Sequence, residues 1–155
     1  MAESVWDYPR PPRLEASSRR VQVVLADIVI ADSSRALRVL ETSHPPVYYI
    51  PREDIAAGVL TPSGGPQSFC EFKGLASYLD VTAGELRAER AAWTYEQPTA
   101  QYAPLAGAVA FYPSRMDTCT IDGVAVTAQE GDFYGGWITP EIEGPFKGGP
   151  GTRGW

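Results

Sequence analysis

Residues 22–31 read Gln-Val-Val-Leu-Ala-Asp-Ile-Val-Ile-Ala, two short apolar runs on either side of Ala26-Asp27. Two such runs separated by two turn-forming residues are typical of an antiparallel hairpin. The longest uninterrupted apolar runs here contain four residues, whereas a membrane-spanning helix needs about 20. The stretch therefore predicts paired β-strands, and it gives no reason to expect contact with a membrane.

The same short pattern continues along the chain between further turn signals. Asp122-Gly123 is the strongest hairpin signal, and Ala83-Gly84 is another turn. Residues 35–42 contain good helix formers, yet Leu37, Val39 and Glu41 alternate with their neighbours, so we favour a strand over a helix. Further strands are expected at 47–50, 68–72, 77–82, 91–95, 109–112, 118–121 and 124–126, and helical turns only at 53–59 and 99–106. We predict an all-β fold of short twisted strands in a coiled or barrel-like arrangement, with one or two short helices.

Changes in composition divide the chain into three parts. Residues 1–20 are polar and contain three prolines, which predicts an extended N-terminal arm. Residues 21–134 form the β-rich core domain. Residues 135–155 contain seven glycines and three prolines, a composition that cannot hold a regular helix or a central strand. Trp137 and Trp155 make this C-terminal arm too apolar for a free tail, so we expect it to be ordered and packed on the core or on a second subunit.

Charge and composition exclude several classes of function. Thirteen basic and nineteen acidic residues give a net charge of −6, which argues against a nucleic acid as partner. One histidine and two separated cysteines cannot build a three-His or four-Cys zinc site, and we expect neither a metal nor a cofactor. Residues 1–9 lack the basic and apolar regions of a secretory signal. We therefore expect a cytoplasmic protein in which Cys70 and Cys119 are reduced thiols.

Chemically versatile residues are densest in residues 33–51. Glu41 lies three residues before His44, the only histidine, and Pro45-Pro46 fixes the backbone that presents them. We predict an acid/base pair in which His44 carries the proton and Glu41 is its orienting partner or base. The alternative is structural: His44 caps the turn before the prolines, and Glu41 pairs with Arg35 or Arg38.

A second group of residues could supply a ligand pocket. A cation that points into an aromatic pocket is a natural anchor for a carboxylate or phosphate, and Lys73 or Arg35 could serve; the alternative is that Lys73 is solvated. Aromatic side chains would form the walls, although most of them are also expected to pack in the core. The predicted ligand-binding residues are Arg35, Tyr48, Tyr49, Lys73, Tyr78, Trp93 and Tyr95. The expected ligand is a small anionic or polar-aromatic molecule.

Four motifs occur in order along the chain. They are the 33–51 stretch, Cys70-x-x-Lys73-Gly74-x-Ala76-x-Tyr78, Ala92-Trp93-x-Tyr95 and Val109-Ala110-Phe111-Tyr112. Over about residues 20–135 their succession resembles an uncharacterised bacterial family, domain of unknown function 427. The resemblance implies a compact β-rich fold. The family is sometimes labelled nucleotidyltransferase-like, but it has no established activity. The chain lacks the Gly-Ser and paired Asp-x-Asp with which such transferases hold two metal ions, so we do not carry that activity over.

Near the predicted site, the sequence also differs from the residues that this family commonly has. Glu71-Phe72 stands where the family commonly has Pro-Trp, and Glu96 stands where a proline follows the Trp-x-Tyr motif. Both changes alter the polarity expected around Lys73 and Tyr95.

Two classes of function remain open. The first is a small-molecule-binding domain, either binding only or an enzyme that uses acid/base chemistry. The second is a non-catalytic interaction or structural module that acts through homodimerisation or a protein partner. The two differ in whether Arg35, Glu41 and Lys73 converge on one concave site or point to separate solvent faces.

Overall fold

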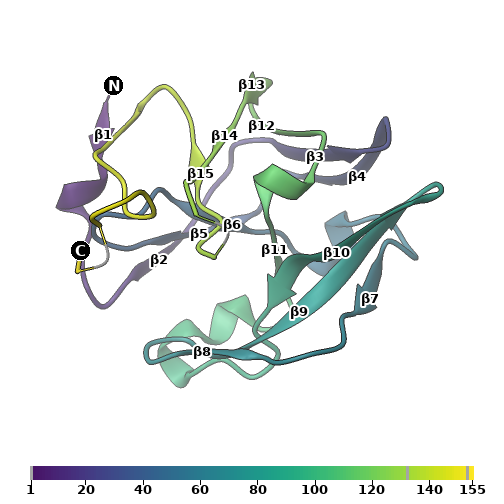
Figure 1. Ribbon diagram of the computed structural model, residues 1–155, viewed down its shortest axis with the longest axis horizontal. Coiled ribbons are helices and arrows are strands. Elements are labelled where there is room, and N and C mark those ends of the chain that lie inside the picture. Colours follow the sequence, from purple (N-terminus) through teal and green to yellow (C-terminus); the bar gives the residue numbers. More distant parts are fainter. Residues whose placement is uncertain (1, 132, 153) are drawn as a thin grey trace.

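The computed structural model describes residues 2–131, 133–152 and 154–155, and its main elements are short β-strands (Figure 1). The largest sheet has the order β11-β10-β9-β7, and β8 also pairs with β9. Its long strands β9 and β10 form a twisted ribbon joined at the predicted Ala83-Gly84 turn. The strands are β7 (Leu60–Pro62), β8 (Ser68–Cys70), β9 (Gly74–Ala83), β10 (Leu86–Thr94) and β11 (Val109–Phe111).

A second sheet of four strands contains both predicted hairpins. Its order is β13-β12-β3-β4, with β3 (Val21–Leu25), β4 (Ile28–Ser33), β12 (Thr118–Ile121) and β13 (Val124–Ala125). Ala26 and Asp27 have φ angles of 53° and 61°, the left-handed pair that a tight two-residue hairpin requires. Asp122-Gly123 makes the same kind of turn between β12 and β13. Both hairpin predictions are confirmed.

The remaining strands tie the two ends of the chain to the middle. A three-stranded sheet contains β2 (Arg13–Ala16), β5 (Leu37–Leu40) and β6 (Val47–Tyr49), so the ambiguous 35–42 stretch is a strand. β1 (Glu3–Ser4) pairs in parallel with β16 (Ile142–Glu143), and β14 (Thr127–Ala128) pairs antiparallel with β15 (Trp137–Ile138). The terminal segments are therefore ordered, and residues 13–16 belong to a sheet.

In the described residues, helical structure is limited to short pieces of 3-10 helix. These are η1 (Val5–Asp7), η2 (Arg52–Asp54), η3 (Ala100–Leu105) and η4 (Pro113–Arg115). Of these, η3 is two turns joined across a kink at Tyr102. The all-β prediction is confirmed, but among the described residues no sheet closes into a barrel. In the part of the chain that the structure describes, no helix has the length and apolar character needed to cross a membrane.

The alternation of side chains along β10, β11 and β6 produces two cores. Val109 and Phe111 face a central core that contains residues of both large sheets, whereas Ala110 and Tyr112 face the other side. This second, aromatic core is built from Tyr49, Trp93, Tyr95, Tyr102 and Tyr112 together with smaller side chains. Because both faces of these strands are buried, the sheet can present an aromatic wall on the side away from the central core.

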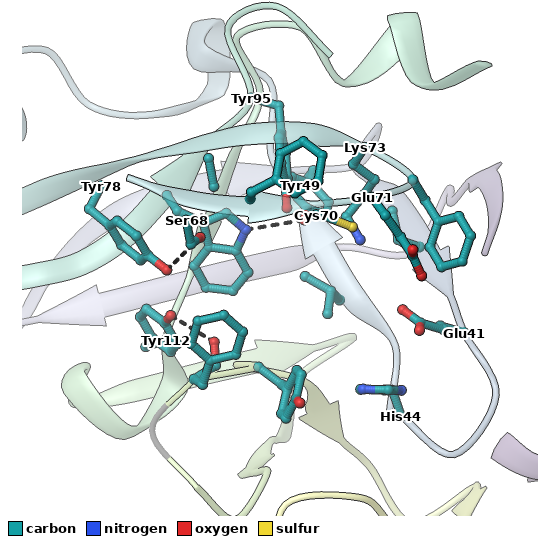
Figure 2. Close-up of a pocket in the computed structure, with 18 of the residues that line it drawn as sticks. Glu41, His44, Tyr49, Ser68, Cys70, Glu71, Lys73, Tyr78, Tyr95 and Tyr112 are labelled. Carbon is teal, nitrogen blue, oxygen red and sulfur yellow. Dashed lines mark hydrogen bonds between the residues drawn. The ribbon is translucent and has the colours of Figure 1, made fainter. Parts of the chain in front are cut away.

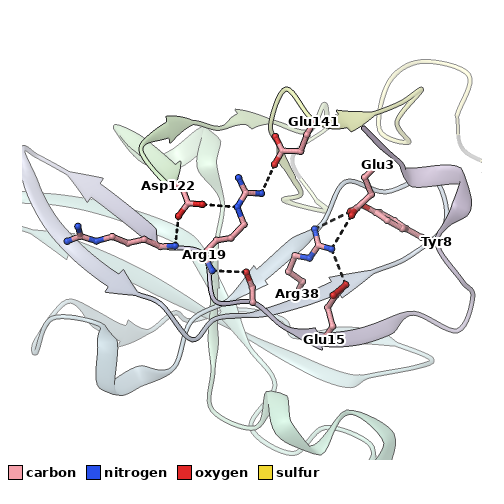
Figure 3. Close-up of polar contacts among 9 residues, drawn as sticks. Glu3, Tyr8, Glu15, Arg19, Arg38, Asp122 and Glu141 are labelled. Atoms are coloured by element: carbon pink, nitrogen blue, oxygen red, sulfur yellow. Dashed lines mark hydrogen bonds and ion pairs between the residues drawn. The ribbon is translucent and has the colours of Figure 1, made fainter. Parts of the chain in front are cut away.

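Arginines near the N-terminus pair with the protein's own carboxylates (Figure 3). Arg19 binds Asp122 at 3.0 Å and Glu141 at 2.6 Å, which joins the start of the core to the C-terminal segment. Arg38 binds both Glu3, at 3.1 Å, and Glu15, at 3.0 Å. These pairs orient the terminal segments more than they stabilise the fold, since exposed ion pairs contribute little individually.

Candidate functional site

A cavity of about 270 Å³ lies beside the aromatic core (Figure 2). Four parts of the chain line it. The first is β5, β6 and the turn between them, and the second is the β8–β9 hairpin. The third is β10 with the residues that follow β10 and β11, and the fourth is the C-terminal segment. Glu41 and His44, from the turn between β5 and β6, and Lys73, from the β8–β9 hairpin, all line this space. The cavity is the natural place to look for function, because ligand sites are concave and largely apolar with a few converging polar groups.

A tight turn brings Glu41 and His44 to the cavity. The backbone N–H of His44 donates to the carbonyl of Glu41 at 3.0 Å, and Ser43 has a φ of 71° that allows the chain to reverse. Glu41 forms an ion pair with Arg10 Nε at 3.4 Å. The residues predicted to pair with Glu41 in the structural alternative, Arg35 and Arg38, bind other carboxylates.

A backbone carbonyl, and not Glu41, orients the imidazole of His44. His44 is 7 % exposed, and its Nδ1 lies 2.9 Å from the carbonyl oxygen of Thr42. A carbonyl can only accept, so Nδ1 carries the hydrogen and Nε2 keeps a free lone pair in the neutral ring. Burial lowers the pKa of His44, and the nearby Glu41 carboxylate opposes this only in part. The predicted role of Glu41 as direct orienting partner is therefore corrected.

The β8–β9 hairpin places Lys73 against the aromatic core. Gly74 has a φ of 109°, a conformation that favours glycine, and it turns the chain directly after Lys73. Thr99 fixes this turn because its N–H donates to the Lys73 carbonyl at 3.0 Å and its hydroxyl donates to the Phe72 carbonyl at 2.6 Å. The Lys73 side chain is 8 % exposed, and its Nζ lies 5.9 Å from the centre of the Tyr95 ring. Within the described residues its ammonium group has neither an ion pair nor a hydrogen bond.

The aromatic wall is held rigidly by polar contacts. Trp93 Nε1 donates to the Tyr49 hydroxyl at 3.1 Å, and the Trp93 and Tyr112 ring centres are 4.6 Å apart. The Tyr112 hydroxyl donates in turn to the Phe133 carbonyl at 2.8 Å. Burial raises the pKa values of Tyr49, Tyr95 and Tyr112, so these hydroxyls stay protonated at neutral pH.

A bulge in β10 sets the position of this wall. The register with β9 shifts between Ala88 and Ala92, where Arg90 adopts a φ of 48°. Asp80 accepts from the backbone N–H of Arg90 at 2.9 Å. Hydrogen bonds from Arg87 and from this N–H lower the pKa of Asp80 to about 2. The Arg90 guanidinium then stacks over Tyr78 at 4.1 Å, which fixes the ring at the edge of the cavity.

The C-terminal segment closes one side of the cavity. The Tyr134 ring meets the His44 ring edge-on at a centre distance of 4.8 Å, and Lys147 Nζ lies 5.2 Å from the Tyr134 ring centre. The backbone N–H of Lys147 donates to the Ser43 carbonyl at 2.8 Å. Phe133 lines the same side. Sequence reasoning missed these contributions, although the aromatic pair 133–134 directly before two glycines is a signal that this segment approaches the core closely.

The structure brings most of the predicted site residues together. Those that line the cavity are Glu41, His44, Tyr49, Lys73, Tyr78, Trp93 and Tyr95. Arg35 does not: its Nε binds Asp54 at 2.9 Å on the surface. Tyr48 does not either, because neighbouring residues of a strand face opposite sides, and Tyr48 packs against Trp137 in the central core at 5.2 Å.

Metal-ligating side chains are scattered in this protein. Over residues 2–131, 133–152 and 154–155, no group of three or more His, Cys, Asp or Glu side chains is placed to hold a metal ion. Cys70 and Cys119 are both free; Cys70 lines the cavity, whereas burial raises the pKa of Cys119 to about 12.

Comparison with protein families places most of this site within one known domain. A family model described as "Domain of unknown function (DUF427)" matches residues 13–122. No curated protein matches the chain. The matched range includes the His44 turn, the Lys73 hairpin and the aromatic wall, but not Phe133, Tyr134 or Lys147. The match extends over more than half of the chain, and the chain belongs to the DUF427 family.

Proposed function

We propose that this protein binds a small anionic molecule in the cavity and that His44 exchanges a proton with it. The observation that carries the proposal is Lys73, a residue only 8 % exposed that lines the cavity and whose ammonium group forms no ion pair or hydrogen bond within the described residues. Because no carboxylate of the protein pairs with this ammonium group, it is available to an anion that enters the cavity. A bound anion would supply the missing partner.

The state of His44 suits proton exchange. Its neutral ring offers the Nε2 lone pair, while Nδ1–H is engaged by the Thr42 carbonyl. A ligand hydroxyl or acid group could therefore donate a proton to Nε2, and the charge that results would lie near the Glu41 carboxylate. The same proton would return to the ligand or leave to water, so that the residue acts as base and then as acid.

Replacing Lys73 by methionine separates a binding role from a structural one. We expect Lys73→Met to change the unfolding free energy by about 1 kcal/mol or less, because the ammonium group has no ion pair to lose and methionine keeps an apolar stem of similar length. It should also abolish the thermal stabilisation that small carboxylates or phosphate give to the wild-type protein, which for an anion at 100 times its Kd is about 2.7 kcal/mol. Thermal and urea unfolding with such anions measure both effects.

Arg35→Met is the matched control for this experiment. It also removes one positive charge, but from the surface, where Arg35 binds Asp54 outside the cavity. The control should keep the full response to anions. A Lys73→Met protein that is less stable and still responds like the wild type would show that Lys73 is structural.

An interaction module remains the second candidate. Phe69 is 72 % exposed and Leu75 is 52 % exposed, and the two residues are partners across the β8–β9 hairpin. Exposed apolar groups of this kind mark contact surfaces, here for a second copy of the chain. This candidate requires no response to anions that depends on Lys73, so the experiment above distinguishes the two. The unpartnered Lys73 favours the first.

The same features support proposals on compartment and partners. Free Cys70 and Cys119 accord with a reducing compartment such as the cytoplasm. Arginines near the N-terminus are engaged by carboxylates, which leaves little basic surface for a nucleic acid.

A further inference from the structure

We propose that the anion is an aromatic carboxylate with one ring or two fused rings. This inference rests on the proposed function, in which Lys73 binds an anion, and it adds the chemical class and the size of the ligand. Three properties of the cavity carry it: the Lys73 ammonium group, which has no ion pair among the described residues, the aromatic walls and the volume that the C-terminal segment leaves.

The charges around the cavity favour a ligand with a single negative charge. Lys73 has no ion pair within the described residues, and Lys147, which donates to the Trp155 carbonyl at 3.2 Å, keeps its positive charge at the cavity. Glu41 also lines the cavity, but its charge is balanced by Arg10, and Glu71 is exposed at the rim. With Glu41 balanced by Arg10, the two lysines and Glu71 leave one net positive charge at the cavity, so one carboxylate would neutralise it, whereas a doubly charged phosphate would leave it negative.

The walls favour a flat, aromatic ligand. The Trp93 ring is held by its hydrogen bond to the Tyr49 hydroxyl and by its contact with the Tyr112 ring, so it presents a fixed aromatic surface to the cavity. Tyr95 lies beside Lys73 and belongs to the same buried cluster. An aromatic ring can stack on such walls or meet them edge-on, and aromatic pairs gain free energy beyond the area they bury.

The volume of the cavity limits the size of the ligand. A dry cavity of about 150 Å³ holds benzene, so about 270 Å³ has room for one ring with a carboxylate or for two fused rings. A nucleotide, with base, sugar and phosphate, would extend out of a cavity of this size, so we expect it to bind more weakly than a compact aromatic carboxylate.

The limit on size comes from residues beyond the matched domain. A Cβ atom on Gly135 would lie 2.6 Å from Trp93 Cη2, which shows how closely the C-terminal segment approaches the aromatic wall. The Tyr112 hydroxyl holds the Phe133 carbonyl, and the Lys147 N–H holds the Ser43 carbonyl, so both ends of this cover are fixed. Phe133 and Tyr134 thus make the ligand size a property of this chain and not of the family domain alone.

Titration of the full-length protein with four probes, followed by amide NMR, tests the inference. The probes are benzoate, cyclohexanecarboxylate, benzamide and AMP. We expect benzoate to bind about three- to tenfold more tightly than cyclohexanecarboxylate, which has the same charge but no aromatic ring. Benzamide, without the charge, should bind about tenfold or more weakly than benzoate, and so should AMP, which exceeds the cavity. In Lys73→Met the affinity for benzoate should fall by the same factor.

A second pair of variants tests the size limit. Tyr134→Ala should allow the three-ring probe 2-anthroate to bind at least tenfold more tightly than it binds the wild type, and the matched Tyr134→Phe should leave its binding unchanged. The four wild-type titrations do not depend on any variant folding well, so a poorly folded variant does not remove the test.

The outcomes separate this inference from the function on which it rests. If anions bind through Lys73 but benzoate binds no better than cyclohexanecarboxylate, or AMP binds as well as benzoate, the ligand class is wrong and the proposed function stands. If no anion binds in a manner that depends on Lys73, the proposed function fails and the inference fails with it.

Discussion

Replacing Trp137 by alanine should lower the unfolding free energy by about 3 to 5 kcal/mol. The Trp137 side chain is completely buried, packs on Tyr48 at a ring distance of 5.2 Å, and donates from Nε1 to the Phe111 carbonyl at 3.1 Å. The substitution leaves both a cavity and an unpaired carbonyl. Urea unfolding followed by circular dichroism would measure the change, which corresponds to roughly 10 °C in Tm for a chain of this length.

Trp6→Ala is the control for this prediction. Trp6 is 41 % exposed, although its Nε1 also donates to a carbonyl, that of Pro145 at 2.8 Å. We expect this control to cost about 1 kcal/mol or less. If the two variants lose the same unfolding free energy, Trp137 contributes no more to stability than an exposed tryptophan, and the C-terminal segment is not part of the hydrophobic core.

Substitution of Gly135 by alanine should cost about 2 to 4 kcal/mol and should disturb the aromatic wall. Two effects add: Gly135 has a φ of 67°, and a Cβ atom there would meet Trp93 at 2.6 Å and Tyr112 at 2.9 Å. Denaturant unfolding measures the loss of stability, and the indole N–H signal of Trp93 should shift because the ring is pushed from its place.

The matched control for Gly135→Ala is Gly58→Ala. Gly58 has a similar φ of 79°, but no atom lies within 4 Å of the position of its Cβ. The control therefore contains the backbone strain without the clash and should cost about 1 kcal/mol. If the two variants lose the same stability, the C-terminal segment does not press on Trp93 as the structure indicates.

Local signals in the sequence were enough to predict most strands of the core and the two tight hairpins, but not β2, which lies in the predicted N-terminal arm, or β7. Ala26-Asp27 and Asp122-Gly123 encode tight hairpins by themselves, because the preference for a left-handed turn is a property of a few residues. Alternation identified the strand at 37–40 for the same reason. What these signals could not give is how the sheets associate: of the coiled and barrel-like alternatives, a closed barrel is not formed by the described residues, because closure depends on contacts between distant strands.

In the candidate site, too, local sequence signals predict some features, and contacts between distant parts of the chain decide the others. Alternation implies that Tyr48 and Tyr49 face opposite sides, but only the packing of the whole chain decides that Tyr49 faces the cavity and Tyr48 the central core. Arg35 is bound by Asp54, a carboxylate that no short-range pattern connects to it. Tyr134 reaches His44 from a segment 90 residues further along the chain, so its contact could not be read from spacing.

The imidazole signal of His44, the only histidine in the chain, gives the most direct test of the binding site. Without ligand, we expect the Nδ1–H tautomer and a pKa below the ordinary 6.5. Because the folded state then binds fewer protons than the unfolded chain, stability should fall as the pH drops below about 6.5 towards the lowered pKa. When benzoate is added at neutral pH, the signal should shift saturably in the wild type and stay unchanged in Lys73→Met. No shift in the wild type, or the same shift in both proteins, would contradict a ligand site shared by Lys73 and His44.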